Sequence, residues 1–126
     1  MSSLAGWSVT VSEFFEGRPD SREFFETVHE AINACGPATV DVSKSQVAFR
    51  RRRRFAAAWV PDRYLHGQHA PLVLTLFLPH HEQSSRWKEV VEPVPGRFTH
   101  HLELAGPEEV DAEVARLLEL AWKAAG

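Results

Sequence analysis

The sequence predicts an α+β fold, a two-layer sandwich in which one five-stranded antiparallel sheet carries an N-terminal and a C-terminal helix on one face. Three observations predict it. Apolar residues recur at the helical period near both ends of the chain, and they alternate at period two between residues 38 and 104. The first connections within that alternating segment are too short for anything except antiparallel hairpins. With 126 residues, the chain is expected to form a single domain over 1–126.

The first forty residues are expected to be helical. Thr10 to Glu13 fits a capping box, in which the Thr oxygen accepts a backbone N–H and the Glu reaches back, so one helical turn should end near Gly17. Asp20 to Glu23 offers a related cap for a second helix near 21–35. The apolar stripe of that helix is Phe24, Val28, Ala31, Ile32 and Cys35. Gly36 and Pro37 then end it.

Five strands are expected, centred on residues 40–42, 47–49, 55–60, 72–78 and 98–104. Lys44 and Ser45 make a tight turn between the first two. The segments Pro61–Ala70 and Pro79–Gly96 are expected to be loops, the second with a turn of helix near Ser84–Val90.

Strict alternation assigns each strand residue to a face of the sheet. The residues expected to face the helices are Val40, Val42, Val47, Phe49, Phe55, Ala57, Trp59, Leu72, Leu74, Leu76, Leu78, Phe98, Leu102 and Leu104. Those expected on the open face are Ala48, Arg50, Arg54, Ala56, Ala58, Val73, Thr75, Phe77, Thr99, His101 and Glu103. Small residues at the centre and charges at the margin describe a shallow trough. Such a trough would seat a ligand, stack a base on Phe77 or pair with the same face of a second chain to form a homodimer.

The last helix is expected near 107–123. Pro107 suits its first position, and Glu108 and Glu109 face the positive end of the helix dipole. Its apolar stripe is Val110, Val114, Leu117, Leu118 and Ala121.

Four short segments, Trp7-Ser8-Val9, Phe49 to Ala56, Gly96 to His100 and Glu108 to Trp122, occur in an order that resembles a bacterial domain of unknown function, family 5655. The resemblance covers roughly residues 7–124. It implies the same layout of helices about a sheet, in a domain found alone or appended to other modules, and it brings no established catalytic residues. A more distant similarity is to the YdhG-like group of small α/β domains, some of which are linked to iron handling.

Charge is divided along the chain. Residues 1–40 and residues 102–126 each carry two basic and six acidic side chains, whereas residues 41–101 carry ten basic and five acidic ones. The middle of the chain is therefore opposite in sign to both ends, which indicates faces of opposite charge.

Half of that basic charge is the run Arg50, Arg51, Arg52, Arg53 and Arg54. Since Phe49 and Phe55 both point at the core, Arg51–Arg53 are expected around a hairpin turn, with Arg50 and Arg54 at the strand ends on the open face. Guanidinium groups suit phosphate or carboxylate, and an anionic partner would offset their mutual repulsion. The alternatives are a solvated, aggregation-resistant tip or a contact with an acidic helix of the same or a neighbouring chain. Replacing Arg51, Arg52 and Arg53 with Ser should abolish phosphate binding and change stability by less than about 0.5 kcal/mol, as expected for exposed sites.

Seven histidines raise the question of a metal site. His100 and His101 are successive strand residues and point to opposite faces, so they cannot both bind one ion. His66 or His69 with Glu82 remains a candidate zinc or iron pair, but the sequence predicts no resident metal. An acidic ridge on the two helices is the alternative iron-handling site. It comprises Glu13, Glu16, Asp20, Glu23, Glu26 and Glu30 on the first helices and Glu108, Glu109, Asp111 and Glu113 near the last one.

Covalent catalysis has little support. The single cysteine, Cys35, lies at a helix C-terminus, which raises rather than lowers the pKa of a thiol, so it is a poor nucleophile. No phosphate loop or nucleophile elbow is present. We therefore expect no enzyme and no cofactor. No segment reaches the length of a membrane span, and the first residues lack signal-peptide features, so a cytoplasmic protein is expected. The sequence thus predicts a small binding or interaction module that contacts an anionic partner, nucleic acid or phosphate, through Arg50–Arg54, Phe77 and His101.

Overall fold

In a computed structural model, the protein is described over residues 10–61, 70–84, 86–87 and 89–126. Ten elements follow one another. They are α1 (Val11–Phe14), α2 (Pro19–Cys35), β1 (Thr39–Val42), β2 (Val47–Arg50), β3 (Arg54–Trp59), β4 (Leu72–Leu78), β5 (Glu89–Val94), β6 (Arg97–Leu104), the 3-10 turn η3 (Pro107–Glu109) and α3 (Ala112–Ala124). The strands form one sheet in the order β1-β2-β3-β4-β6-β5, and each neighbouring pair is antiparallel.

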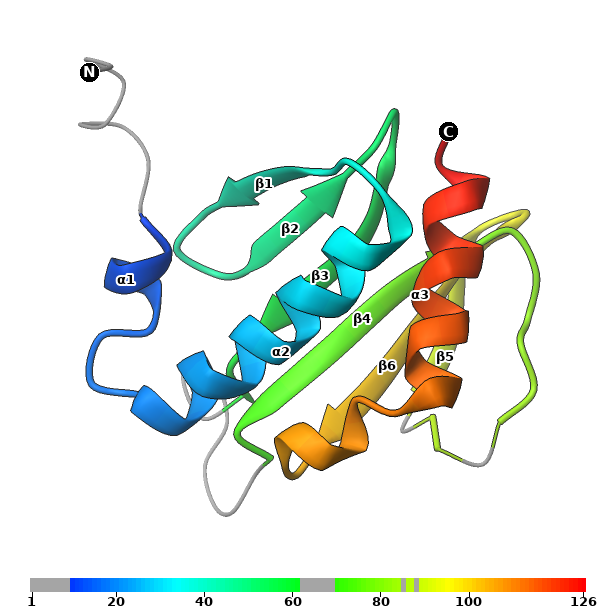
Figure 1. The fold of residues 1–126 in the computed structure, drawn as a ribbon. Coiled ribbons are helices and arrows are strands. Elements are labelled where there is room, and N and C mark those ends of the chain that lie inside the picture. Colours follow the sequence, from blue (N-terminus) through cyan, green and yellow to red (C-terminus); the bar gives the residue numbers. More distant parts are fainter. Residues whose placement is uncertain (1–9, 62–69, 85, 88) are drawn as a thin grey trace.

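Helices α2 and α3 lie side by side across one face of the sheet (Figure 1). The core fills the space between these layers, with Phe25, Val28 and Ile32 from α2 and Leu117 and Leu118 from α3 buried against the strands. The α+β class with one antiparallel sheet and helices at both ends is confirmed.

The N-terminal helices differ in how well their starts were predicted. Thr10 Oγ1 accepts from the backbone N–H of Glu13, and the Glu13 carboxylate accepts from the N–H of Thr10, so the capping box is confirmed. The cap predicted at Asp20 is wrong. Helix α2 begins at Pro19, whose missing N–H would have no partner in the first turn, and the flanking Arg18 makes no side-chain cap.

Gly36 ends α2, as predicted, and its φ of +151° favours glycine. A Cβ atom at this position would collide with the indole ring of Trp122, so the glycine also allows α3 to approach. The Trp122 Nε1 donates to the carbonyl oxygen of Pro37 at 3.0 Å. The predicted last helix, 107–123, is interrupted. Residues 107–109 form η3, and α3 starts anew after Asp111, whose carboxylate accepts from the N–H of Val114 at 3.1 Å.

The sheet has six strands rather than five, because residues 89–94 pair with β6. The expected loop Pro79–Gly96 is therefore wrong for residues 89–94, and the expected turn of helix near Ser84–Val90 is wrong where it overlaps this strand. Strand β5 lies at an edge, contains Pro93, and leaves Val91 and Val94 exposed. Edge strands tolerate proline and need no apolar alternation, so this one carries no strand signal in its sequence.

A β-bulge changes the predicted faces of β3. The register between β2 and β3 shifts between Phe49 and Arg50, so that both Phe55 and Ala56 belong to the core. Beyond this point Ala56 and Ala58 face the helices, and Ala57 and Trp59 face the other way, which is the reverse of the prediction. The indole Nε1 of Trp59 donates to Thr75 Oγ1 on that second face at 3.1 Å.

Candidate anion-binding site

The arginine run forms the turn between β2 and β3, as predicted. Arg50 pairs with Arg54 across the hairpin, and Arg51–Arg53 make the turn. The tip does not stand free in solvent. The backbone N–H groups of Arg52 and Arg53 both donate to the carbonyl oxygen of Ala125, at 3.1 and 3.0 Å, so the tip lies against the C-terminal end of α3.

Two arginine side chains add to this contact. Arg53 Nη2 donates to the carbonyl oxygen of Ala124 at 2.8 Å, and Arg51 Nη1 donates to that of Trp122 at 3.2 Å. The Arg51 guanidinium also lies 3.6 Å from the centre of the Trp122 ring. Carbonyl groups at a helix C-terminus lack partners and carry partial negative charge, so cations are stabilising there. The hairpin therefore docks on a helix of its own chain, through carbonyl oxygens rather than acidic side chains.

The remaining arginines of the run divide again. Arg50 Nε lies 3.3 Å from the Asp41 carboxylate of β1, in a pair that is half exposed. The side chains of Arg52 and Arg54 have no hydrogen bond or ion pair within the described part of the chain. Arg52 is at the tip, whereas Arg54 lies at the start of β3, beside a hollow in the surface.

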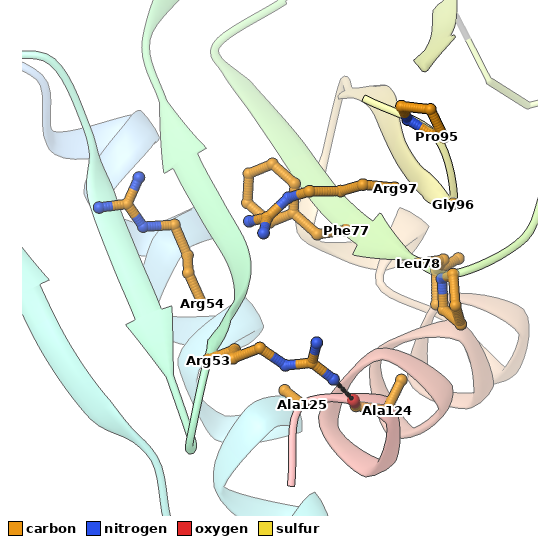
Figure 2. A pocket seen from close by; sticks show the side chains of 10 residues that line it. Arg53, Arg54, Phe77, Leu78, Pro95, Gly96, Arg97, Ala124 and Ala125 are labelled. Atoms are coloured by element: carbon orange, nitrogen blue, oxygen red, sulfur yellow. Dashed lines mark hydrogen bonds between the residues drawn. The ribbon is translucent and has the colours of Figure 1, made fainter. Parts of the chain in front are cut away.

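The hollow lies where the β2–β3 hairpin, the β5–β6 turn and the end of α3 meet, and it has a volume of about 220 Å³ (Figure 2). Its lining residues are Arg53, Arg54, Phe77, Leu78, Pro79, Pro95, Gly96, Arg97, Ala124 and Ala125. The Arg97 guanidinium lies over the Phe77 ring, 5.0 Å from its centre, in cation–π contact. Figure 2 shows Arg97 crossing above this ring, with Arg54 beyond it on the same side of the sheet.

The lining is positive. Among the described residues, it contains three guanidinium groups and no carboxylate. The Glu92 carboxylate nearby accepts the backbone N–H of Gly96 at 3.0 Å, so it is bound within its own turn. Because the guanidinium group keeps its charge at every physiological pH, the hollow is a lasting site of positive potential in a protein of net charge −3.

Of the residues predicted for an anion site, Arg53, Arg54 and Phe77 line the hollow, and Arg50, Arg51, Arg52 and His101 do not. Arg97 was missed. Alternation along β6 places Arg97 on the same face as Thr99, the cross-strand partner of Phe77, so the signal was present in the register.

The centre of the predicted trough is covered rather than open. Ala48, Val73 and Thr75, which the sequence placed in the trough, are at most 4% exposed, and Ala57, which the bulge brings to this face, is fully buried. His101 is partly buried, its Nδ1 lies 2.8 Å from Thr75 Oγ1, and its ring lies edge-on to that of Trp59. Burial lowers the pKa of His101, with an opposing effect from Glu89. His101 is therefore held within the sheet face, away from the hollow.

The histidines are engaged in other ways. His100 is fully buried; its Nε2 accepts the backbone N–H of Glu82 at 3.0 Å, and its Nδ1 lies 3.3 Å from the carbonyl oxygen of Phe98. His100 and His101 thus point to opposite faces, as predicted. His80 Nε2 lies 2.9 Å from the Glu82 carboxylate. The candidate ligands His66 and His69 lie outside the described residues. Across the described ranges, no three His, Cys, Asp or Glu side chains are grouped to hold a metal ion.

Several acids of the predicted ridge have partners of their own. Glu13 belongs to the capping box, and Glu26 lies 3.3 Å from Arg22 Nε. Arg86 Nη1 contacts Asp111 at 2.9 Å and Glu113 at 3.1 Å. The pKa of Asp111 is lowered mainly by the hydrogen bond from the N–H of Val114, and Arg86 lowers it further. Burial raises the pKa of the Cys35 thiol, with Glu119 adding to the rise, so this group is a weak nucleophile near neutral pH.

Comparison with known proteins bears on the fold and leaves the site open. The model of the family "Domain of unknown function (DUF5655)" matches residues 11–125. No curated protein and no solved structure matches the chain, and the more distant similarity to the YdhG-like domains has no counterpart in these comparisons. No helix among the described residues combines the length and the apolar character needed to cross a membrane. The family match covers nearly the whole chain, and the protein belongs to the family DUF5655.

Proposed function

We propose that this member of the family DUF5655 is a non-enzymatic cytoplasmic module that binds an anionic partner in the hollow beside the arginine hairpin. The observation that carries the proposal is the grouping of Arg53, Arg54 and Arg97 around one hollow that has no carboxylate in its lining. Like charges repel, so such a group is costly unless a negative charge is bound or the groups are well solvated. Planar guanidinium forks are suited to phosphate and carboxylate oxygens.

The arginines of the hairpin differ in their contacts, and this difference indicates which of them are available to an anion. Arg51 and Arg53 hold the end of α3, and Arg50 pairs with Asp41. Arg54 and Arg97 are exposed and are free of carboxylate partners in the described part of the chain. We infer that binding depends on these two more than on the length of the arginine run.

The test is a titration of isotopically labelled protein with inorganic phosphate, followed by NMR, against sodium chloride at matched ionic strength. Saturable shifts at Gly96, Arg97 and Ala124 are expected, since these residues surround the hollow. The double variant Arg54→Gln, Arg97→Gln should lose the shifts. Arg52→Gln is the control for charge on the hairpin: it removes one charge, half that of the double variant, from the same hairpin as Arg54 but outside the lining. Shifts that are no larger than those in chloride would remove the proposal.

Nucleic acid and a second copy of the chain are the macromolecular partners that the sequence suggested. A duplex contact through Arg52, Arg54 and Arg97 should show a log–log salt slope no steeper than about −2.7, since each neutralised phosphate contributes about −0.9. A slope near −4.5 would instead require all five hairpin arginines, and therefore release of the tip from α3. Sedimentation at increasing protein concentration tests the homodimer.

A further inference from the structure

The number of positive charges around the hollow indicates which kind of anion it binds. The inference drawn from it rests on the function proposed above. We propose that the site takes a small organic phosphate monoester, with its dianionic phosphate group among Arg53, Arg54 and Arg97 and its organic part against the apolar wall. The group that the arginines would recognise is a terminal phosphate with two charges and three free oxygens.

The number of guanidinium groups matches this phosphate. A monoester presents three terminal oxygens and carries close to two negative charges at neutral pH, whereas a diester presents two oxygens and carries one charge. Three guanidinium groups with no carboxylate in the lining favour the more highly charged ligand. A carboxylate, with two oxygens in one plane, would leave one of the three groups unused.

Two of the three groups are held in place before any ligand binds. Arg53 is fixed by its bond to the carbonyl oxygen of Ala124, which uses one of its five N–H donors. Arg97 is fixed by its contact with the Phe77 ring. Fixed side chains lose less conformational entropy on binding, so part of the cost of ordering these arginines is already met by the fold. The Arg54 side chain has no such contact among the described residues, and it would move onto the ligand.

The Phe77 ring is covered by Arg97 on the side of the hollow, so it does not offer a free face to a nucleobase. Leu78 also lines the hollow but is only 2% exposed, and the other lining residues include Pro79, Pro95 and Ala124. These side chains offer apolar surface without hydrogen-bond donors. They fit the body of a small organic molecule better than the sugar and base of a polynucleotide.

The size of the hollow sets an upper limit. At about 220 Å³, it is smaller than the roughly 300–1,000 Å³ of pockets that bury drug-sized ligands. A phosphate with a small ring or short chain attached is of the right order. A duplex would contact only the rim of the hollow.

Three ligands that share a phenyl group test separately the effect of ligand charge and of the number of terminal oxygens. Phenyl phosphate has two charges and three terminal oxygens near pH 8, phenyl sulfate has one charge and three oxygens, and methyl phenyl phosphate has one charge and two oxygens. We expect phenyl phosphate to bind about tenfold more tightly than phenyl sulfate, as one added charge among several guanidinium groups implies, and methyl phenyl phosphate to bind most weakly. Affinity is measured by NMR titration at the resonances of Gly96 and Arg97.

The pH profile is a second readout. The affinity for phenyl phosphate should fall as pH drops through about 6, the second pKa of a phosphate monoester. The affinity for phenyl sulfate should not fall, because sulfate does not titrate there and the charged groups among the described lining residues are arginines. Arg54→Gln and Arg97→Gln should each weaken phenyl phosphate binding, and Arg52→Gln should leave it unchanged.

The outcomes distinguish the two proposals. If no anion binds at these residues, both the proposed function and this inference fail. If the diester and the sulfate bind as tightly as phenyl phosphate, the anion site stands, the monoester inference is overturned, and a nucleic-acid backbone becomes the better ligand. Preferential binding of a phosphorylated peptide over phenyl phosphate would assign the terminal phosphate to a protein partner and overturn the small-molecule assignment.

Discussion

The two faces of the sheet hold their side chains by different means. On the face that packs under α2 and α3, apolar side chains such as Phe49, Leu74 and Leu76 are fully buried in one continuous core. On the other face, Thr75 bridges Trp59 and His101 through hydrogen bonds, and Arg97 covers Phe77. The first face is stabilised by the amount of apolar area removed from water, and the second by a few directed contacts between neighbouring strands. The difference shows where stability and binding can be separated. Truncating a residue of the first face should cost much of the stability, whereas replacing Arg54 or Arg97 should change binding with little effect on the fold.

The largest effect is expected on the core face. Leu76→Ala should lower the free energy of unfolding by about 2–5 kcal/mol, because the residue is fully buried at the centre of β4 and its removal leaves a cavity. Urea denaturation followed by circular dichroism measures the change. Thr75→Val, on the same strand but facing the other way, leaves no comparable cavity and should cost only the hydrogen bonds that Thr75 makes with Trp59 and His101, about 1 kcal/mol each. A loss below about 1 kcal/mol for Leu76→Ala would show that the centre of the core lies elsewhere.

A smaller effect is expected for Trp59, which the sequence placed in the core. Trp59→Ala should cost about 1–2 kcal/mol, since the ring is partly exposed on the second face and the loss combines its contact area with one hydrogen bond to Thr75. Trp59→Phe keeps most of the ring and should cost about 1 kcal/mol, the part due to the hydrogen bond. If Trp59→Ala were as damaging as Leu76→Ala, the alternating assignment would be correct and the bulge at Phe55 would not exist.

This residue shows where prediction from sequence ends. Alternation assigned the core residues of β2 and β4 correctly, and Leu102 and Leu104 of β6, because these strands keep their period. Phe98, which was assigned to the same face of β6, is only half-buried and lies outside the core. In β3 the period breaks at Phe55, and no local signal marks it, since alanine is compatible with either face. A single extra residue in a strand exchanges every later side chain between faces.

The candidate site was predicted in part for a related reason. The turn at Arg51–Arg53 and the positions of Arg54 and Phe77 followed from local patterns. The contact of the turn with α3 did not, because it joins residues 71 positions apart through backbone carbonyl oxygens, which have no sequence identity. Arg97 comes from a third segment, which follows the edge strand β5, where a loop was predicted from the sequence. Local periodicity reveals elements, and a site assembled from three distant segments needs their register as well.

A third effect tests how the arginine tip is held. The double variant Arg51→Gln, Arg53→Gln should destabilise the protein by about 1 kcal/mol, because it removes two cations from the C-terminus of α3. This corrects the expectation that changes at Arg51–Arg53 stay within about 0.5 kcal/mol. Arg52→Gln is the matched control and should stay within that limit, since its side chain makes no such contact in the described residues.

Salt gives an independent check of the same contact. The destabilisation by the double variant should shrink in 1 M salt, where charges are screened over about 3 Å. The cost of Leu76→Ala should not shrink, because apolar burial is not weakened by screening. An unchanged cost of the double variant in high salt would mean that packing of Arg51 on Trp122, rather than charge, holds the tip.

The smallest effect on stability at neutral pH concerns His100 and His101, which point to opposite faces of the sheet. This effect grows in acid. Burial lowers the pKa of both His100 and His101 below the ordinary value of about 6.5. The unfolded chain therefore binds protons more readily than the native one, so stability is fully present above about pH 6.5 and falls as pH drops toward the lowered pKa values. For His100, the nearby His81 and His80 add to the lowering, whereas its hydrogen bond with Phe98 and the nearby Glu82 oppose it; for His101, Glu89 opposes it.

Urea midpoints measured between pH 7.5 and 5 test this dependence. Carboxyl groups with a lowered pKa, such as Glu82, Glu13 and Asp111, lose their contribution only in more acid solution, so the histidines dominate this interval. His100→Gln should flatten the curve, because an amide oxygen can accept the N–H of Glu82 and does not titrate. His101→Gln, on the second face, should flatten it separately. If neither variant changes the slope, the burial of these two histidines is not the source of the loss of stability in acid. If both do, and to different extents, the ratio measures how much each face of the sheet depends on a neutral histidine.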